Sequence, residues 1–135
     1  MVLHSLFRHL LSFPSSLFYL APLYSHLMDC DPQFILQFSF RWMNCFLMRE
    51  FTKLSLIIRM WDTYFAEGDG FAVFHTYVCT ALLLQWSSQL KQLDAEKLML
   101  FLQHLPTQEW TDKEMELLLS HAYVTFSPSS CNYSP

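Results

Sequence analysis

Apolar and polar positions along this chain recur with the period of α-helices. Between residues 34 and 48, the polar residues Gln37, Arg41 and Asn44 follow one another at i, i+4 and i+7, and large apolar residues fill the positions between them. This spacing predicts a helix that presents one polar stripe to water and packs its other faces against neighbouring elements.

A second helix is expected over about 54–66, with Thr52 as a plausible N-cap residue. Arg59 and Asp62 lie three positions apart on it, so the two side chains can pair across one turn. Trp61 stands between them and is expected to be buried. The pattern favours a polar clasp between helices, and the alternative is direct contact of the charged pair with a partner.

The segment 71–90 is apolar on most faces and predicts a central helix that other elements surround. It has no charge and is long enough to span a membrane, but polar residues such as Gln85 favour a buried core helix. The uncharged stretch 9–28 contains Pro14 and Pro22 and would make a poor spanning helix. We therefore expect no stable transmembrane segment.

Two further helices have clear ends in the sequence. Asp94 is expected to cap one of them, which must stop before Pro106. Thr111 and Glu114 form a T-x-x-E capping box at the start of the other. The apolar spacing of this last helix predicts its buried face: Met115, Leu118, Leu119 and Ala122.

Every convincing period is helical, and no alternating strand pattern lies between turn signals, so the predicted fold class is all-α, a helical bundle. The 135 residues fit one domain. Residues 1–32 form a poorly defined apolar segment, which is either one or two short helices or a sequence foreign to the domain. The domain itself is placed at 33–124, and residues 125–135 are expected to form a disordered tail.

Composition excludes several classes of function. Eight Lys and Arg residues stand against twelve Asp and Glu residues, which argues against a basic nucleic-acid surface. The only two glycines lie in one loop, so no glycine-rich phosphate cradle exists. The four cysteines have no close spacing, which predicts reduced thiols in the cytosol rather than a disulfide scaffold. We expect Cys45 and Cys79 to be buried. Cys30 and Cys131 are expected to be more exposed.

No constellation of residues predicts a catalytic or metal centre. His75 and Cys79 lie four apart and share a helix face, as two metal ligands can, but no second pair accompanies them, which favours a packed core histidine and cysteine. A G-x-S-x-G motif is absent, and no carboxylate pair sits in an acid–base frame. The residues by themselves therefore predict no catalytic residue, no cofactor and no metal.

Four blocks of the sequence, read together, resemble the TBC domain, the all-helical catalytic domain of Rab GTPase-activating proteins. They occur in the family's order within about 34–123, and the nearest likeness is to Golgi-associated Rab regulators. One R-x-W-D motif would be weak evidence, whereas four ordered blocks are specific. The blocks are "QFSFRWMNCFLMREF" (37–51), "IIRMWDTYFAE" (57–67), "FHTYVCTALLLQW" (74–86) and "LPTQEWTDKEMELLLSHAY" (105–123).

The resemblance covers only the C-terminal part of that domain. Family members act through an Arg in an I-x-x-D-x-x-R block and a Gln in a Y-x-Q block, and neither block occurs in this sequence. The resemblance therefore implies a partial TBC domain, a regulator of a GTPase rather than an enzyme, which has no catalytic residue of its own and is inactive alone. It assigns packing roles to the family signature residues Arg41, Trp42, Arg59, Trp61 and Asp62.

The resemblance also implies a Rab GTPase as partner, a cytoplasmic location that includes the periphery of Golgi membranes, and a role of the full-length form in Rab-dependent vesicle trafficking. Two other functions stay open. One is a non-catalytic module that holds a Rab or a partner helix through an apolar surface. The other is a membrane-associated helical protein.

Overall fold

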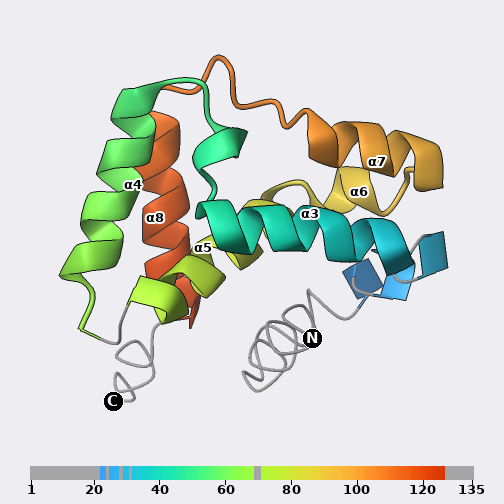
Figure 1. Cartoon of the computed structure of the whole chain (residues 1–135), viewed down its shortest axis with the longest axis horizontal. Coiled ribbons are helices and arrows are strands. Elements are labelled where there is room, and N and C mark those ends of the chain that lie inside the picture. The colour runs from blue at the N-terminus through green and yellow to red at the C-terminus, as the bar shows by residue number, and fades with distance from the viewer. Residues whose placement is uncertain (1–21, 24, 28, 31, 69–70, 127–135) are drawn as a thin grey trace.

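A computed structural model describes five stretches of the chain, namely residues 22–23, 25–27, 29–30, 32–68 and 71–126 (Figure 1). The described residues before 31 are helical, and no strand occurs within these stretches. The predicted all-α fold class is therefore confirmed. In chain order the elements are α3 (Pro32–Cys45), the 3-10 helix η1 (Met48–Glu50), α4 (Leu54–Ala66), α5 (Phe71–Gln85), α6 (Ser87–Leu90), α7 (Ala95–Gln103) and α8 (Asp112–Phe126).

Helix α5 lies at the centre of the bundle. Every side chain from Phe74 to Leu83 is buried. A helix with no polar face must be surrounded, and α5 packs against α8, α4 and α3. Figure 1 shows α5 crossing behind α3, with α4 and α8 towards one end of the molecule and α6 and α7 towards the other. The predicted central helix is confirmed.

Helix α3 ends at Cys45, before the predicted end at Met48. The next two residues, Phe46 and Leu47, adopt left-handed backbone conformations with φ of 50° and 64°. Such conformations are unfavourable for residues other than glycine. The Leu47 side chain is fully buried, and its N–H donates to the Trp42 carbonyl at 3.3 Å. Burial and this closing hydrogen bond offset the backbone cost and turn the chain.

The predicted helix 71–90 is also interrupted, because the chain turns at Trp86 between α5 and α6. The Trp86 ring is buried, with its centroid 5.7 Å from that of Phe101 and 6.1 Å from that of Trp110. These aromatic contacts join segments that a continuous helix would hold apart. Within the stretches that the structure describes, no helix is both long and apolar enough to cross a bilayer.

The predicted caps of the last two long helices are confirmed. The Asp94 carboxylate accepts a hydrogen bond from the Lys97 N–H at 2.9 Å and caps α7. At α8, the Thr111 N–H donates to Glu114 Oε2 at 2.6 Å, and the Lys113 N–H donates to Thr111 Oγ1 at 3.3 Å. The Thr111–Glu114 bond is that of a capping box, and the Thr111 hydroxyl caps the second residue of the helix.

The prediction of Thr52 as the N-cap of α4 is wrong. Thr52 is exposed, and Lys53 stands at the cap position with no side-chain capping bond. The Lys53 amine instead donates to the Trp110 carbonyl at 2.7 Å, and the Phe51 ring packs on the Trp110 ring at 5.6 Å. Tertiary contacts with the chain just before α8 therefore fix the start of α4.

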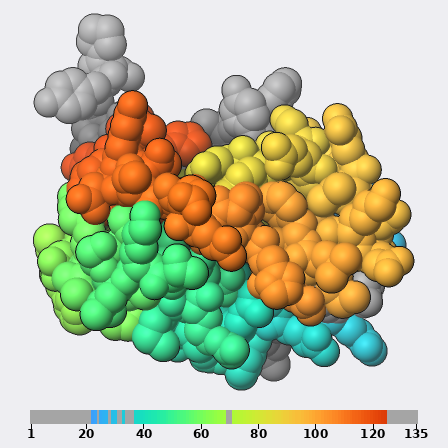
Figure 2. All heavy atoms as spheres, turned by 90° about the horizontal axis from the view of Figure 1, so that it is seen from above, coloured from blue at the N-terminus to red at the C-terminus, as the bar shows by residue number. Residues whose placement is uncertain are grey.

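The connection between α7 and α8 lies on the surface and runs alongside η1 and the start of α4 (Figure 2). Thr107 is buried within it and donates its hydroxyl to the Glu50 carbonyl at 2.5 Å. At the other end of the molecule, His26 Nε2 is 2.9 Å from the Leu93 carbonyl. The histidine ring N–H donates there, because a carbonyl can only accept, and ties the helical residues before 31 to the chain after α6.

The buried face of α8 is confirmed, because all its predicted members are buried: Met115, Leu118, Leu119 and Ala122. The helix runs to Phe126, two residues into the range predicted as a tail, and residues 127–135 lie outside the described part of the chain. Cys30 and Cys45 are half-buried and Cys79 is fully buried, all as free thiols, while Cys131 lies outside the described residues.

The cap of α7 gives a direct test of this structure. Asp94→Ala removes the acceptor for the Lys97 N–H and is expected to lower the free energy of unfolding by about 1 kcal/mol. Asp94→Asn keeps a capping oxygen and should stay close to wild type. Urea unfolding followed by circular dichroism measures both, and equal losses for the two variants would contradict the capping role.

Candidate functional site

The family signature residues do not meet in one cleft. Arg41 and Trp42 lie on α3, and Arg59, Trp61 and Asp62 lie on α4. Four of them contact different neighbouring elements, and the Asp62 side chain is exposed. The site is therefore built from several local contacts.

Arg41 forms a two-point ion pair with Glu50 of η1. Its Nε donates to Glu50 Oε1 at 2.8 Å and its Nη2 donates to Oε2 at 3.2 Å. The same Nη2 donates to the Leu102 carbonyl of α7 at 3.2 Å. Burial raises the pKa of the Glu50 carboxyl, and the Arg41 charge partly opposes this rise. One guanidinium thus joins α3, η1 and α7.

The predicted polar stripe of α3 is only partly correct. Gln37 and Asn44 are exposed as expected, but the Arg41 side chain is only 25% exposed because it turns towards Glu50, whose side chain is 3% exposed. The partner comes nine residues later, on the far side of the left-handed turn. No local helical spacing reveals such a contact.

Trp42 borders a buried polar cluster that centres on His75. The histidine is fully buried, with Nε2 at 3.0 Å from the Trp42 carbonyl and Nδ1 at 2.9 Å from the Tyr64 hydroxyl. A carbonyl can only accept, so Nε2 carries the proton and Nδ1 accepts from Tyr64. Burial lowers the pKa of His75 to about 4, against the opposing effect of the Trp42 carbonyl. A neutral imidazole therefore connects α5 to α3 and α4.

Cys79 lies one turn after His75, with its Sγ 3.6 Å from Nε2, so the predicted shared helix face is correct. Burial raises the pKa of the Cys79 thiol, which keeps it protonated and unreactive. Among the described residues, no group of three or more His, Cys, Asp or Glu side chains is placed to hold a metal ion.

The indole of Trp42 is buried as well. The indole N–H makes no hydrogen bond of normal geometry within the described structure. It lies close enough to Glu50 to favour the charged carboxylate, and so opposes in small part the rise that burial causes in the pKa of Glu50. The ring packs edge-on against Phe38 with 5.3 Å between centroids. Trp42 thus fills the core beside the Arg41 ion pair.

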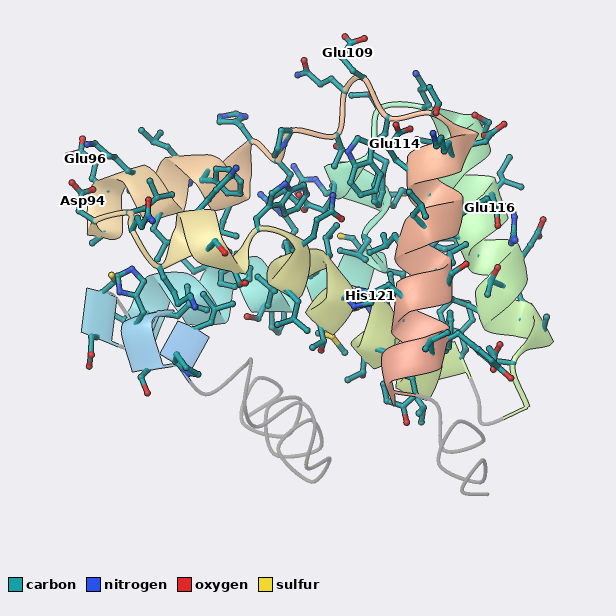
Figure 3. The ribbon with its side chains drawn as sticks, turned by 180° about the vertical axis from the view of Figure 1, so that it is seen from behind. Asp94, Glu96, Glu109, Glu114, Glu116 and His121 are labelled. Atoms are coloured by element: carbon teal, nitrogen blue, oxygen red, sulfur yellow. The ribbon has the colours of Figure 1, made fainter. Side chains whose placement is uncertain are left out.

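The predicted pairing of Arg59 with Asp62 is wrong. Arg59 instead reaches α8, where its Nε is 2.5 Å from Glu116 Oε1 and its Nη2 is 3.0 Å from Oε2. Its Nη1 donates to the Thr63 hydroxyl. Glu116 on the neighbouring helix α8 offers a carboxylate that binds the guanidinium at two points. The short Asp62 side chain points to solvent and offers no such geometry. In Figure 3, Glu116 lies on the side of α8 that faces α4.

Trp61 is half-buried rather than buried. Its indole N–H donates at 3.0 Å to the carbonyl of Phe46, the first left-handed residue after α3. The Phe46 ring in turn packs edge-on against Phe71, with 4.8 Å between centroids. Trp61 therefore satisfies a carbonyl that the end of α3 leaves without a helical partner.

A groove of about 250 Å³ lies between α4 and α8. Phe74 and Leu119, both buried, line it together with the Arg59–Glu116 ion pair and the hydroxyl-bearing Ser120. The Arg59 guanidinium in this groove is already bound to the Glu116 carboxylate. The groove therefore presents no activated nucleophile and no free arginine. Nothing in this geometry supports acid–base or nucleophilic chemistry.

Four contributors to these contacts escaped prediction from the sequence. Their partners are distant in the chain: Glu50 pairs with Arg41 nine residues away, Tyr64 bonds His75 eleven residues away, and both Glu116 and Thr107 bond residues fifty-seven positions away. All four residues lie inside the quoted sequence blocks. Position in a block was the only available signal, and it named no partner.

The two ion pairs differ in depth, which sets the expected cost of breaking them. Arg41→Met leaves the Glu50 carboxylate buried without its partner and should lower the free energy of unfolding by about 3 kcal/mol. Arg59→Met leaves Glu116 half-exposed to water and should cost about 1 kcal/mol or less. Denaturant unfolding of both variants at pH 7 measures this difference, and equal costs would contradict the assigned depths.

His75 makes stability depend on pH in a defined direction. Its pKa falls from 6.5 to about 4 on folding, so the unfolded chain binds the proton more tightly. Stability is complete above pH 6.5 and falls as the pH drops towards 4, by about 3 kcal/mol for this group. Unfolding of wild type and His75→Gln across this range isolates the contribution. An NMR titration in which the His75 ring protonates near pH 6.5 would refute it.

The fold is similar to a solved Rab-GAP structure. The crystal structure of the Ypt/Rab-GAP domain of Gyp1p superposes with a TM-score of 0.72 and 42% sequence identity. The match covers 88% of this chain and 37% of that domain chain. At this identity the likeness extends beyond general architecture.

Curated relatives show the same likeness in sequence. The chain is 54% identical over 104 residues to GTPase-activating protein gyp1 of Schizosaccharomyces pombe, a match over 76% of this chain and 20% of that protein. It is also 54% identical over 89 residues to TBC1 domain family member 22A of Homo sapiens, over 65% of this chain and 17% of that protein. The chain thus spans about a fifth of the length of these relatives.

The family profile supplies the remaining comparison. The Rab-GTPase-TBC domain profile matches residues 4–91, which include most of the N-terminal segment and every helix from α3 to α6. The limits 1–32 and 33–124 stay predictions. Profile, relatives and solved structure agree with the four sequence blocks, and the chain belongs to the Rab-GTPase-TBC domain family.

Proposed function

We propose that this chain contributes a helical part of a Rab GTPase-activating domain and does not accelerate GTP hydrolysis by itself. The observation that carries the proposal is that neither I-x-x-D-x-x-R nor Y-x-Q occurs anywhere in the sequence. The family's catalysis depends on the Arg and the Gln of these two blocks. The match to only 37% of the solved Rab-GAP domain is in keeping with a partial domain.

The three arginines within the described part of the chain offer weak substitutes for a finger. Arg41 and Arg59 are each bound to a carboxylate at two points, so extending either one towards a phosphate would break an ion pair. Arg49 is exposed on η1, but it stands in a block whose family positions serve packing. No accompanying Y-x-Q glutamine is present to orient a water molecule.

We propose a structural role for the signature residues. Arg41, Trp42, Arg59 and Trp61 join α3 and α4 to η1, α7, α8 and the turn after α3 through the contacts described above. These contacts hold helices that are far apart in the sequence in one arrangement. Asp62 is the exception, because its side chain faces solvent.

We further propose a Rab family small GTPase as the partner of the full-length form, which acts in vesicle trafficking on the cytoplasmic face of Golgi membranes. The support is the family membership and the named relatives, which include a GTPase-activating protein. The isolated chain keeps the helical framework of that function without its chemistry.

Single-turnover GTP hydrolysis by a panel of purified Rab proteins tests the catalytic part. An arginine finger is worth roughly 10³–10⁵ in rate, so the chain should leave the intrinsic rate almost unchanged. The Ypt/Rab-GAP domain of Gyp1p serves as the positive control. A strong acceleration by the purified chain would sink the proposal, and Arg49→Ala would then show whether the exposed arginine is responsible.

A further inference from the structure

Helix α4 carries a row of apolar side chains on its outer face. Leu54 is 68% exposed, Ile58 50% and Phe65 77%, and the half-buried Trp61 completes the row. The spacing is four, three and four residues, so these side chains form one stripe along the helix. We call these four residues the α4 stripe. Helix α4 lies at the edge of the molecule in Figure 1.

The α4 stripe is not needed for the core. A different face of α4 supplies the buried residues Leu56, Ile57, Met60 and Tyr64. The stripe continues onto the next helix, because the Phe65 ring contacts the Phe71 ring with 5.0 Å between centroids. Contiguous exposed apolar surfaces of this kind typically mark interaction sites, whereas single exposed apolar residues do not. Aromatic side chains are also enriched among residues that dominate binding energy.

The geometry of the stripe favours a helix as its occupant. A spacing of four, three and four residues is the a/d seam along which two α-helices pack together. A peptide that binds by β-strand addition would instead need an exposed sheet edge, and the described residues contain no strand. The stripe therefore fits the apolar seam of a second helix.

The charged residues near the stripe indicate which kind of helix it would bind. Asp62 is exposed one turn from Ile58 and has no partner among the described residues. The cations at this helix are engaged elsewhere: Arg59 binds Glu116, and Lys53, just before the helix, donates to the Trp110 carbonyl. The one charge of α4 that lacks a partner is thus negative, which complements a positively charged partner.

We propose that the α4 stripe binds an amphipathic helix of a partner protein, with apolar residues at its a and d positions and Lys or Arg beside them. The apolar seam supplies most of the affinity, and Asp62 selects for basic flanks. This surface is independent of the proposed lack of GTPase-activating activity, because none of its residues belongs to a finger block.

A labelled synthetic peptide tests the proposal by fluorescence anisotropy with the whole chain. The probe is about four heptads long, with Leu at a and d and Lys at e and g, whose like charges oppose pairing with itself. A second peptide carries Glu in place of each Lys. The Lys peptide should bind wild type at least about tenfold more tightly than the Glu peptide, a difference of about 1.4 kcal/mol.

Matched variants locate the binding surface. Phe65→Ser should weaken binding of the Lys peptide about tenfold or more, whereas Leu117→Ser, a similar change at a side chain on α8 that is 62% exposed, should leave it unchanged. Asp62→Asn should reduce the preference for the Lys peptide, and Glu109→Gln, an equal charge change on the exposed α7–α8 connection, should not. All four side chains are exposed, so circular dichroism should show intact folds.

Several outcomes would overturn the proposal. They are failure of the Lys peptide to bind, equal binding of both peptides, and binding that survives Phe65→Ser. Sedimentation of the chain alone tests whether a second copy of the chain occupies the α4 stripe instead. A dimer that Phe65→Ser abolishes would assign the α4 stripe to a second copy of this chain and exclude a basic partner helix as its natural occupant.

Discussion

The arrangement of this domain depends on the burial of α5. A helix that is enclosed on every side must satisfy each of its polar side chains inside the protein, because an unpaired buried polar group is costly. Thr76 and Thr80 donate to carbonyls one turn earlier in their own helix, each at 3.0 Å. His75 reaches outward, to the Trp42 carbonyl and the Tyr64 hydroxyl. This pair of bonds fixes how α3 and α4 sit against the central helix.

Two arginines serve the same architecture at different depths. Arg41 lies inside the junction of α3, η1 and α7, where its partner Glu50 is almost fully buried. Arg59 lies at the surface between α4 and α8, where both charges stay partly in water. A buried ion pair specifies one geometry because losing either partner is costly, while an exposed pair contributes little beyond local alignment. Both guanidinium groups are committed to carboxylates of the chain itself.

The elements of this fold were largely predictable, and the junctions were not. Helical periodicity located α4, α5 and α8, and the capping signals at Asp94 and Thr111 marked helix starts correctly, because both depend on residues within one turn. The end of α3 and the break at Trp86 were missed. There, burial of Leu47 and of the Trp86 indole overrides the local helical preference, and the partners of that burial are remote in the sequence.

The candidate site divides in the same way. The sequence by itself determined the all-α class, the buried face of α8 and the family. Only the tertiary structure decided that Arg41 turns from its polar stripe to Glu50, that Arg59 chooses Glu116 over Asp62, and that the α4 stripe faces outward. Helical spacing defines which side chains can meet within one helix. Which of them do meet depends on the carboxylates and apolar surfaces that neighbouring helices bring alongside, and packing alone sets that.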